Sequence, residues 1–172
     1  MKKIASLVLL LFISILTYEQ EQFTSKGEAL TYLKGAFSKY FVKEKVTLSN
    51  VKMFDDVPQY FSYEFTDRYL LISRTVKNSD MLSSYFMLIP FDKISRITPV
   101  INDAYFAQST HLFIKSNCRC FKYTSGKKFN GEEKYDEVKD LQVIPFNLTD
   151  EDKIGESLTN AFKTLAGSNF EQ

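Results

Sequence analysis

Apolar residues recur at helical spacing in two stretches, one near each end of the chain. From Leu30 to Phe41, and again from Ile154 to Leu165, they fall three or four positions apart, which places them along one face of a helix. The second stripe consists of Ile154, Leu158, Ala161, Phe162 and Leu165, and Gly167 follows it as a C-cap. The pattern therefore predicts an N-terminal helix and a C-terminal helix.

Both helices carry start signals. Ser25 and Glu28 fit a capping box, which starts the first helix. Thr149 is the predicted N-cap of the second, and the acidic run 150–152 suits the positive end of its dipole better than it suits a metal site. Gly155 allows close approach to a sheet. We expect the first helix to pack on the sheet or its edge; a membrane-surface helix is the alternative, but it would want more Lys and Arg on its polar face.

Between the helices the chain reads as short strands rich in aromatic and β-branched residues. Turn signals separate them at 55–58, at Asp67, at 77–80 and at 102–103, whereas 104–110 has no clear pattern. The spacing is too short for βαβ units, so the prediction is an α+β domain in which an antiparallel sheet or partly closed barrel of about seven to eight strands is covered by the C-terminal helix. The predicted strands are 45–54, 59–66, 68–76, 83–90, one following 91–98, 111–115, 118–123 and 141–146.

The strand from Tyr60 to Phe65 places aromatic residues on both of its faces. One interpretation is an exposed aromatic binding surface. The favoured interpretation is that both faces are covered, one by the C-terminal helix and the other by the N-terminal helix or an opposing sheet, because aromatic side chains dominate cores.

The first residues have the pattern of a secretory signal. Lys2 and Lys3 precede an apolar run that ends at Leu16 and is short for a membrane span. We predict a signal peptide over residues 1–17, with cleavage between Thr17 and Gln20, and a single domain over 21–172; an uncleaved N-terminal anchor is the alternative. The expected location is the periplasm, the cell surface or the exterior.

Composition and charge exclude one class of partner. The chain has 22 Lys and Arg against 21 Asp and Glu, and removal of Lys2 and Lys3 leaves 20 against 21, a formal net charge of −1. Nucleic-acid binding requires clustered basic residues, and Lys127 and Lys128 are followed closely by Glu132 and Glu133. We expect no nucleic-acid partner, and no basic patch supports lipid binding. The aromatic-rich composition fits a packed core.

Potentially reactive side chains gather in one place. Two strands around the turn Ser116-Asn117 would form a hairpin with His111, Cys118 and Cys120 on one face. One His and two Cys are too few for a metal site without carboxylates. Export permits a disulfide, but residues two apart in an extended strand lie near the limit of bridging, so reduced, packed cysteines are the prediction.

Two further segments have simple interpretations. The polar stretch 124–138 lacks calcium-loop spacing and is predicted to be a solvated loop between the last two strands. Residues 147–149 match an N-glycosylation acceptor, a frequent chance match, and the same Thr149 accounts for the helix cap.

Several short runs follow the order of a helix, strands and a final helix: 30–34, 86–90, 91–94, 112–114, 154–165 and, within the last of these, 161–165. This element order resembles the pleckstrin-homology-like folds and small exported proteins of unknown role from Bacteroidetes-type bacteria. The resemblance implies lipid head-group or peptide binding, but Asp55 and Asp56 occupy the loop where a lipid-binding version has basic residues. It transfers no functional residue.

Three functions remain open. The favoured one is an exported, non-catalytic binding module for a protein or peptide. The alternative is a binder of hydrophobic ligands or lipids in the envelope, with a pocket lined by the aromatic strands. An enzyme is least favoured, because the chain lacks the common nucleophile, metal-protease and phosphate-loop motifs, and a lone His111 on a strand is more often packed or at the surface than a base. We assign no catalytic residue, metal ligand or cofactor.

Overall fold

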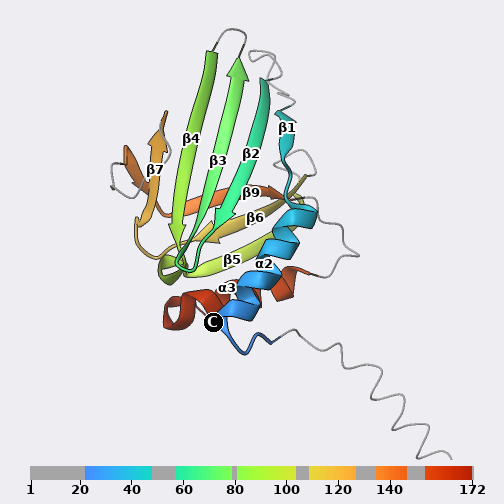
Figure 1. Ribbon diagram of the computed structural model, residues 1–172, viewed down its shortest axis with the longest axis vertical. Helices are drawn as coiled ribbons and strands as arrows, with labels where there is room; N and C mark the ends of the chain where they lie inside the picture. The colour runs from blue at the N-terminus through green and yellow to red at the C-terminus, as the bar shows by residue number, and fades with distance from the viewer. Residues whose placement is uncertain are drawn as a thin grey trace, which may run out of the picture.

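The fold is α+β, with antiparallel strands and a helix from each end of the chain, as the sequence predicted, but the strands form two sheets where one sheet or a partly closed barrel was expected (Figure 1). The computed structural model describes residues 22–47, 57–78, 81–103, 109–126, 135–146 and 154–171. Within these ranges the elements are α2 (Lys26–Tyr40), β1 (Glu44–Thr47), β2 (Val57–Phe65), β3 (Tyr69–Asn78), β4 (Met81–Pro90), η1 (Phe91–Lys93), β5 (Arg96–Asp103), β6 (Ser109–Lys115), β7 (Phe121–Ser125), β8 (Glu137–Lys139), β9 (Leu141–Phe146), α3 (Gly155–Ala166) and η3 (Gly167–Asn169).

The strands form two antiparallel sheets rather than one closed barrel. The larger has six strands in the order β1-β2-β3-β4-β7-β8, and the smaller has three in the order β5-β6-β9. The chain passes from one sheet to the other at Asp140, the single residue between β8 and β9. A lone antiparallel bridge between Phe41 and Phe146 ties the end of α2 to the end of β9. The described residues thus contain nine strands, slightly more than the predicted seven or eight.

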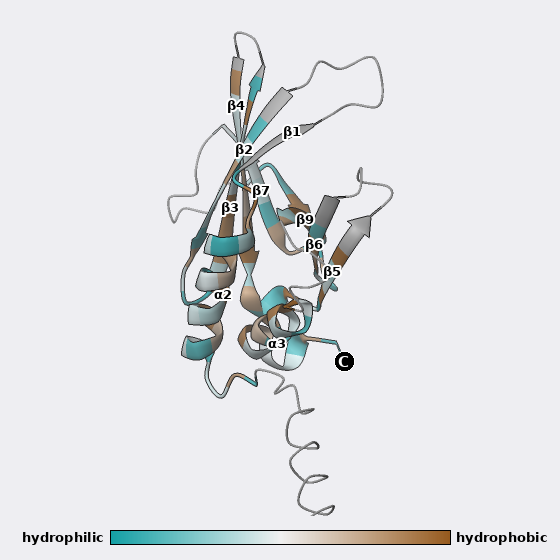
Figure 2. Cartoon of the chain, turned by 90° about the vertical axis from the view of Figure 1, so that its right-hand side faces the viewer, coloured by the Kyte–Doolittle hydropathy of each residue, from teal (hydrophilic) through white to brown (hydrophobic). Residues whose placement is uncertain are grey.

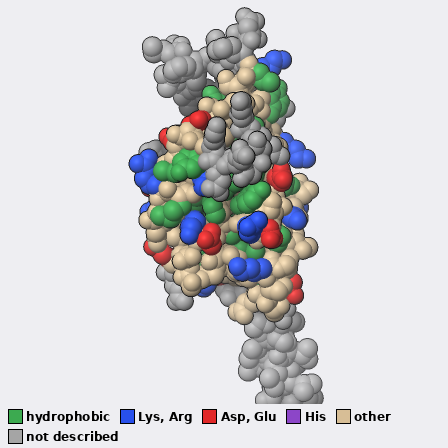
Figure 3. Space-filling model, turned by 60° about the vertical axis from the view of Figure 1, so that its left-hand side comes forward, with side chains coloured by type: hydrophobic (Ala, Val, Ile, Leu, Met, Phe, Trp, Pro, Cys, Tyr) green, Lys and Arg blue, Asp and Glu red, His purple; other side chains and the backbone are tan. Residues whose placement is uncertain are grey.

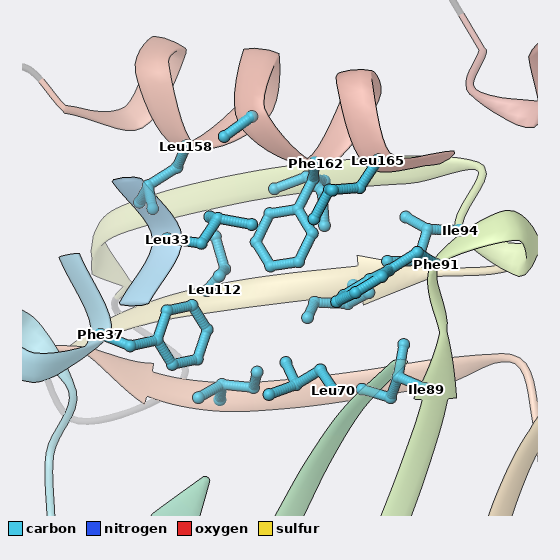
Figure 4. Packing of buried hydrophobic residues seen from close by; sticks show 14 of the residues in the cluster. Leu33, Phe37, Leu70, Ile89, Phe91, Ile94, Leu112, Leu158, Phe162 and Leu165 are labelled. Atoms are coloured by element: carbon cyan, nitrogen blue, oxygen red, sulfur yellow. The ribbon is translucent and has the colours of Figure 1, made fainter. Parts of the chain in front are cut away.

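The core lies between the two sheets at the end closed by both helices. From α3, Phe162 and Leu165 point toward Leu112 of the smaller sheet and toward Leu33 of α2 (Figure 4). Phe37 of α2 lies at the centre of an aromatic cluster whose other members are Phe41, Tyr63, Phe65, Phe146 and Phe162. Figure 2 shows hydrophobic residues on the parts of β3, α2 and α3 that face this interior.

The helix stripes are confirmed with small shifts. In α3 the buried residues are Leu158, Ala161, Phe162, Leu165 and Ala166. In α2 they are Ala29, Leu33, Ala36 and Phe37, whereas Leu30, the first residue of the predicted stripe, is half-buried. Helix α3 packs on α2, β5 and η1, which confirms it as a cover, although it closes one end of the sheet pair rather than a whole face.

The start of α2 is confirmed in most of its detail. Ser25 Oγ accepts from the backbone N–H of Glu28 at 3.2 Å. The Glu28 carboxylate reaches back one residue further than predicted, to the backbone N–H of Thr24 at 2.9 Å and its hydroxyl at 2.8 Å. These hydrogen bonds hold the pKa of Glu28 below its ordinary value of 4.5.

The predicted start of the C-terminal helix is wrong. Helix α3 begins at Gly155, preceded by Ile154 with no side-chain cap, so Thr149 does not cap it. The first turn of the helix lies against Pro99 of β5, where a Cβ at position 155 would come within 3.2 Å of Pro99 Cγ. Gly155 therefore supplies the predicted close approach to a sheet. Residues 147–153, with the glycosylation pattern, lie outside the described residues.

Strands extend into three of the predicted turns: β2 and β3 enter those at 55–58 and 77–80, and β5 includes all of 102–103, where the turn prediction is wrong. Val57 and Pro58 belong to β2, where Pro58 precedes the first β2–β3 pair and removes no donor from that ladder. Strand β3 runs on to Asn78, and β5 runs on to Asp103. The turn at Asp67 is confirmed, with Thr66 N–H donating to Tyr69 O at 3.0 Å.

The predicted hairpin around Ser116-Asn117 is wrong. Strand β6 pairs with β5 and β9, whereas β7 pairs with β4 and β8, so the two strands belong to different sheets. Residues 116–120 form a turned connection between the sheets. Ser125 and Glu137, expected in a solvated loop, lie in the paired strands β7 and β8. Of that loop, residues 127–134 lie outside the described residues, as does the signal-peptide prediction.

Candidate functional site

The inner face of the larger sheet is covered by helices and the smaller sheet at one end only. Strands β2, β3 and β4 continue beyond the level of β5, β6 and β9 in both cartoon views (Figures 1 and 2). Register aligns Phe61, Arg74, Tyr85 and Ser125 across four neighbouring strands. The next row toward the core is Tyr63, Ile72, Met87 and Tyr123. These two rows lie where the covered part of the face ends.

A pocket of about 130 Å³ lies at this boundary between the two sheets. Its apolar part comes from the larger sheet, where Ile72 and Met87 are 3% and 5% exposed and belong to the core. Its polar part includes Gln142 of β9, whose side-chain amide donates to Val143 O at 2.7 Å. The lining residues are Phe61, Ile72, Arg74, Tyr85, Phe86, Met87, Tyr123, Lys139 and Gln142.

Two cations and two tyrosines form a stacked row in this pocket. The Tyr85 and Tyr123 rings are stacked, with centroids 6.1 Å apart and planes 21° apart. The Arg74 guanidinium carbon lies 5.1 Å from the Tyr85 centroid, and Lys139 Nζ lies 4.3 Å from the Tyr123 centroid. Each cation is thus held over the electron-rich face of a ring. We call Arg74, Tyr85, Tyr123 and Lys139 the aromatic–cation row.

The two cations differ in their acidic neighbours. Lys139 Nζ pairs with Glu137 Oε1 at 2.9 Å. The Arg74 side chain is exposed, and it forms no ion pair with a carboxylate within the described part of the chain. Arg74 therefore presents a positive charge at the edge of the pocket without a carboxylate partner from the described residues.

This environment changes the pKa of Tyr123. Burial raises its pKa above the ordinary value of 10.0, the neighbouring Tyr85 adds to the rise, and the Arg74 charge opposes it. The Tyr123 phenol is accordingly neutral at physiological pH and can donate or accept a hydrogen bond.

The side chains that the sequence singled out as reactive do not share a site. His111 is 3% exposed on β6, where its ring lies 6.4 Å from that of Phe113. It is a packed residue, as expected for a lone histidine on a strand. Because β6 and β7 are not paired, the predicted common face with Cys118 and Cys120 does not form.

The prediction of reduced cysteines is also wrong, because Cys118 and Cys120 are joined by a disulfide. In an extended strand the two cysteines would lie near the limit of bridging. The chain instead turns here, with Cys120 N–H donating to Cys118 O at 2.9 Å, and the Cα atoms lie 5.3 Å apart, within the usual bridging range.

The favoured prediction for the aromatic strand is half right. Phe61, Tyr63 and Phe65 face inward and contact the aromatic cluster around Phe37 and Phe41. The opposite face is not covered, since Tyr60 is 41% exposed and Glu64 is exposed. Burial alternates strictly along this strand, as expected for a sheet with one solvated face.

Sequence reasoning missed the aromatic–cation row, although one signal was available. Along β3, Leu70, Ile72 and Arg74 share one face, so a charged residue lies on the same face of the strand as two core residues. An arginine in an inward phase is unusual unless it is paired or faces a ligand. Lys139 had no comparable sequence pattern, because it follows directly after the predicted loop 124–138 and lies in no predicted strand.

Other surfaces offer less chemistry. A wider hollow of about 500 Å³ is lined by Gln22, Phe23, Asn160, Lys163, Thr164 and Gly167.

The face in Figure 3 mixes apolar side chains with charges of both signs and shows no field of one sign. Across the described ranges no three His, Cys, Asp or Glu side chains group as metal ligands. No helix in those ranges has the length and apolarity to cross a bilayer.

Comparisons with protein-family models, with curated proteins and with solved structures give no significant match. The resemblance to pleckstrin-homology-like folds therefore stays a prediction.

Proposed function

We propose that this protein is a non-catalytic binding module that takes a peptide segment of a partner protein into the pocket between its sheets. The aromatic–cation row beside an apolar floor is the observation that carries the proposal. An export signal on residues 1–17 would place this binding in the envelope or outside the cell.

The size of the pocket favours a side chain over a whole small molecule. Small-molecule sites commonly enclose roughly 300–1,000 Å³, and this pocket has about 130 Å³. One apolar or aromatic side chain fits such a volume, whereas a long acyl chain does not. The alternative of a lipid or hydrophobic-ligand binder is therefore less well supported.

The charge of the pocket favours an acidic group next to that side chain. Arg74 has no carboxylate partner among the described residues, and the ring of Tyr85 holds its guanidinium in place. A guanidinium can bind a carboxylate through two parallel hydrogen bonds. The expected ligand is thus a peptide with an apolar side chain beside a carboxylate, either an acidic side chain or the C-terminus.

The chemistry of the lining supports binding rather than catalysis. The ionisable lining residues are Arg74, Tyr85, Tyr123 and Lys139, without a carboxylate or histidine. Histidine is the commonest general acid or base, and carboxylates also serve often, so the commonest acid–base groups are missing from this lining. His111 is buried in the smaller sheet and does not line the pocket.

Site-specific photo-crosslinking in the native host tests the proposal. A benzophenone amino acid replaces Tyr85 in the pocket or, as a matched control, Tyr60 on the solvated face of the same sheet. We expect a discrete protein adduct at position 85 that is absent at position 60 and is lost when Arg74→Glu is added. Equal adducts at both positions, or lipid adducts alone at position 85, would contradict the proposal.

A further inference from the structure

The disulfide between Cys118 and Cys120 lies in the turn that carries the chain from β6 of the smaller sheet to β7 of the larger one. Cys118 is exposed and Cys120 is half-buried directly before the core residue Phe121. Solvent, and a thiol dissolved in it, therefore reach Cys118 more readily than Cys120.

Hydrogen bonds also hold this turn. Ser116 N–H donates to Asp140 O at 2.8 Å, and the Asn117 side-chain amide donates to Glu171 Oε1 at 2.8 Å. The Arg119 guanidinium donates to Val138 O at 3.2 Å. None of these three hydrogen bonds, two to the end of β8 and the residue after it and one to Glu171, involves a sulfur atom.

The bond also contributes little as a cross-link. A disulfide stabilises mainly by closing a loop in the unfolded chain, and the effect grows with loop length. This one spans a sequence separation of 2, which leaves the smallest constraint on the unfolded state. A bond with one exposed cysteine and so short a loop fits a chemical role better than a structural one.

A polar neighbour would assist the release of Cys118 as a thiolate. Ser116 Oγ lies 3.1 Å from Cys118 Sγ, and in the disulfide only the hydroxyl has a hydrogen to donate. The same donor would stabilise a thiolate on Cys118 after reduction, because hydrogen bonds to the charged form lower the pKa of a thiol.

We propose that Cys118 and Cys120 form a thiol–disulfide exchange site. An incoming thiolate attacks Sγ of Cys118, a mixed disulfide forms, and Cys120 leaves as a thiolate. A second thiolate then attacks the sulfur of the incoming group and releases Cys118. The net reaction reduces the protein disulfide to two thiols by two electrons, while two thiols of the co-reactant are oxidised to a disulfide.

Redox titration of the intact protein tests the equilibrium. The purified chain is equilibrated with mixtures of reduced and oxidised glutathione and quenched with acid, and its free thiols are counted by alkylation and mass spectrometry. We expect a reversible change from no thiols to two, with far- and near-ultraviolet circular dichroism unchanged. A bond that resists excess reduced glutathione and also excess dithiothreitol until the protein unfolds overturns the proposal, as does a dithiol that oxidised glutathione leaves unreacted.

The two reductants distinguish the co-reactant. Reduction by glutathione and dithiothreitol alike supports exchange with small thiols, whereas reduction by dithiothreitol alone supports a dithiol partner.

Single-cysteine variants test the assignment of the attacked sulfur. With oxidised glutathione, Cys120→Ser, which keeps Cys118, should form an adduct several-fold faster than Cys118→Ser, which keeps Cys120. Ser116→Ala added to Cys120→Ser should raise the pKa of the Cys118 thiol, read from the pH dependence of alkylation. Equal adduct rates for folded variants, or a faster reaction at Cys120, would contradict the order of attack.

Discussion

Gly155 opens helix α3 directly against Pro99 of β5, so that a Cβ at position 155 would lie 3.2 Å from Pro99 Cγ and 3.4 Å from Pro99 Cβ. The first turn of the C-terminal helix therefore lies against a residue from a different part of the chain, and the lack of a Cβ at position 155 permits this approach.

Larger residues at position 155 should destabilise the protein. Gly155→Val adds atoms where Pro99 already lies close, and overpacking of this kind costs about 1–3 kcal/mol in the free energy of unfolding. Chemical denaturation measures the change. Gly35→Ala is the control, because a Cβ there has no neighbour within 4 Å; that change should stabilise α2 by up to about 1 kcal/mol. A neutral Gly155→Val would show that Pro99 can move away.

Truncation of Phe162 should be among the most damaging changes in α3. Its side chain is 0% exposed, and its ring centroid lies 6.3 Å from that of Phe37. Phe162→Ala is expected to cost about 3–5 kcal/mol through lost burial and the cavity left behind. Lys163→Ala, at an exposed position on the same helix, should change stability by less than about 0.5 kcal/mol. An unchanged melting temperature for Phe162→Ala would mean that α3 is not part of the core.

A double-mutant cycle isolates the aromatic contact between the helices. Phe37→Leu, Phe162→Leu and the double variant should show a coupling energy of about 0.5–1.5 kcal/mol, because edge-to-face aromatic pairs contribute that much beyond burial. Strict additivity would indicate that the two rings contribute through area alone.

The cap of α2 should make stability depend on acid. The pKa of Glu28 is lowered in the folded state, first by the Thr24 hydroxyl and then by the Thr24 backbone N–H. Its contribution is therefore fully present above the ordinary pKa of 4.5 and is lost as pH falls through the lower folded value. Glu28→Gln should flatten the loss of stability below this pH, and Thr24→Val, which removes only the hydroxyl, should flatten it in part. Urea unfolding at a series of acidic pH values measures both slopes, and parallel slopes for wild type and Glu28→Gln would contradict the cap's role.

Arg74 should limit how far burial raises the pKa of Tyr123. Because the guanidinium charge favours the phenolate, Arg74→Met should raise the pKa of Tyr123 further above 10.0. The sign for stability follows: this tyrosine contributes fully below its ordinary pKa, and the contribution is lost as pH rises through the folded value. Carbon-13 NMR of labelled tyrosine rings follows the titration. Arg68→Gln, in the exposed turn after β2, is the control, and an equal shift in both variants would argue against a specific Arg74 effect.

Local signals predicted the elements whose ends are determined locally. Strand β9 spans the predicted residues 141–146, Ser25 caps α2, and Gly167 ends α3 with φ of +67°. Each depends on a short pattern: an apolar run, a side-chain oxygen before a helix, or a glycine after it.

The errors arose where a partner distant in sequence decides the outcome. Ser116-Asn117 between two alternating runs is a valid hairpin pattern, but β6 takes β5 and β9 as partners and β7 takes β4 and β8. The cysteine prediction failed with the hairpin, because it depended on an extended chain. The aromatic–cation row was hidden for the same reason, since its four residues line up only after β3, β4, β7 and β8 have paired.

The bridge between Phe41 and Phe146 has a consequence for the order in which this chain can fold. A polypeptide that emerges from a ribosome or a translocation channel exposes the aromatic side chains of α2 long before β9 and α3 are available to cover them. Contacts so distant in sequence make folding slow, because loop closure must precede the stabilising contacts. Newly made chains should therefore depend on holding chaperones until their last residues are released.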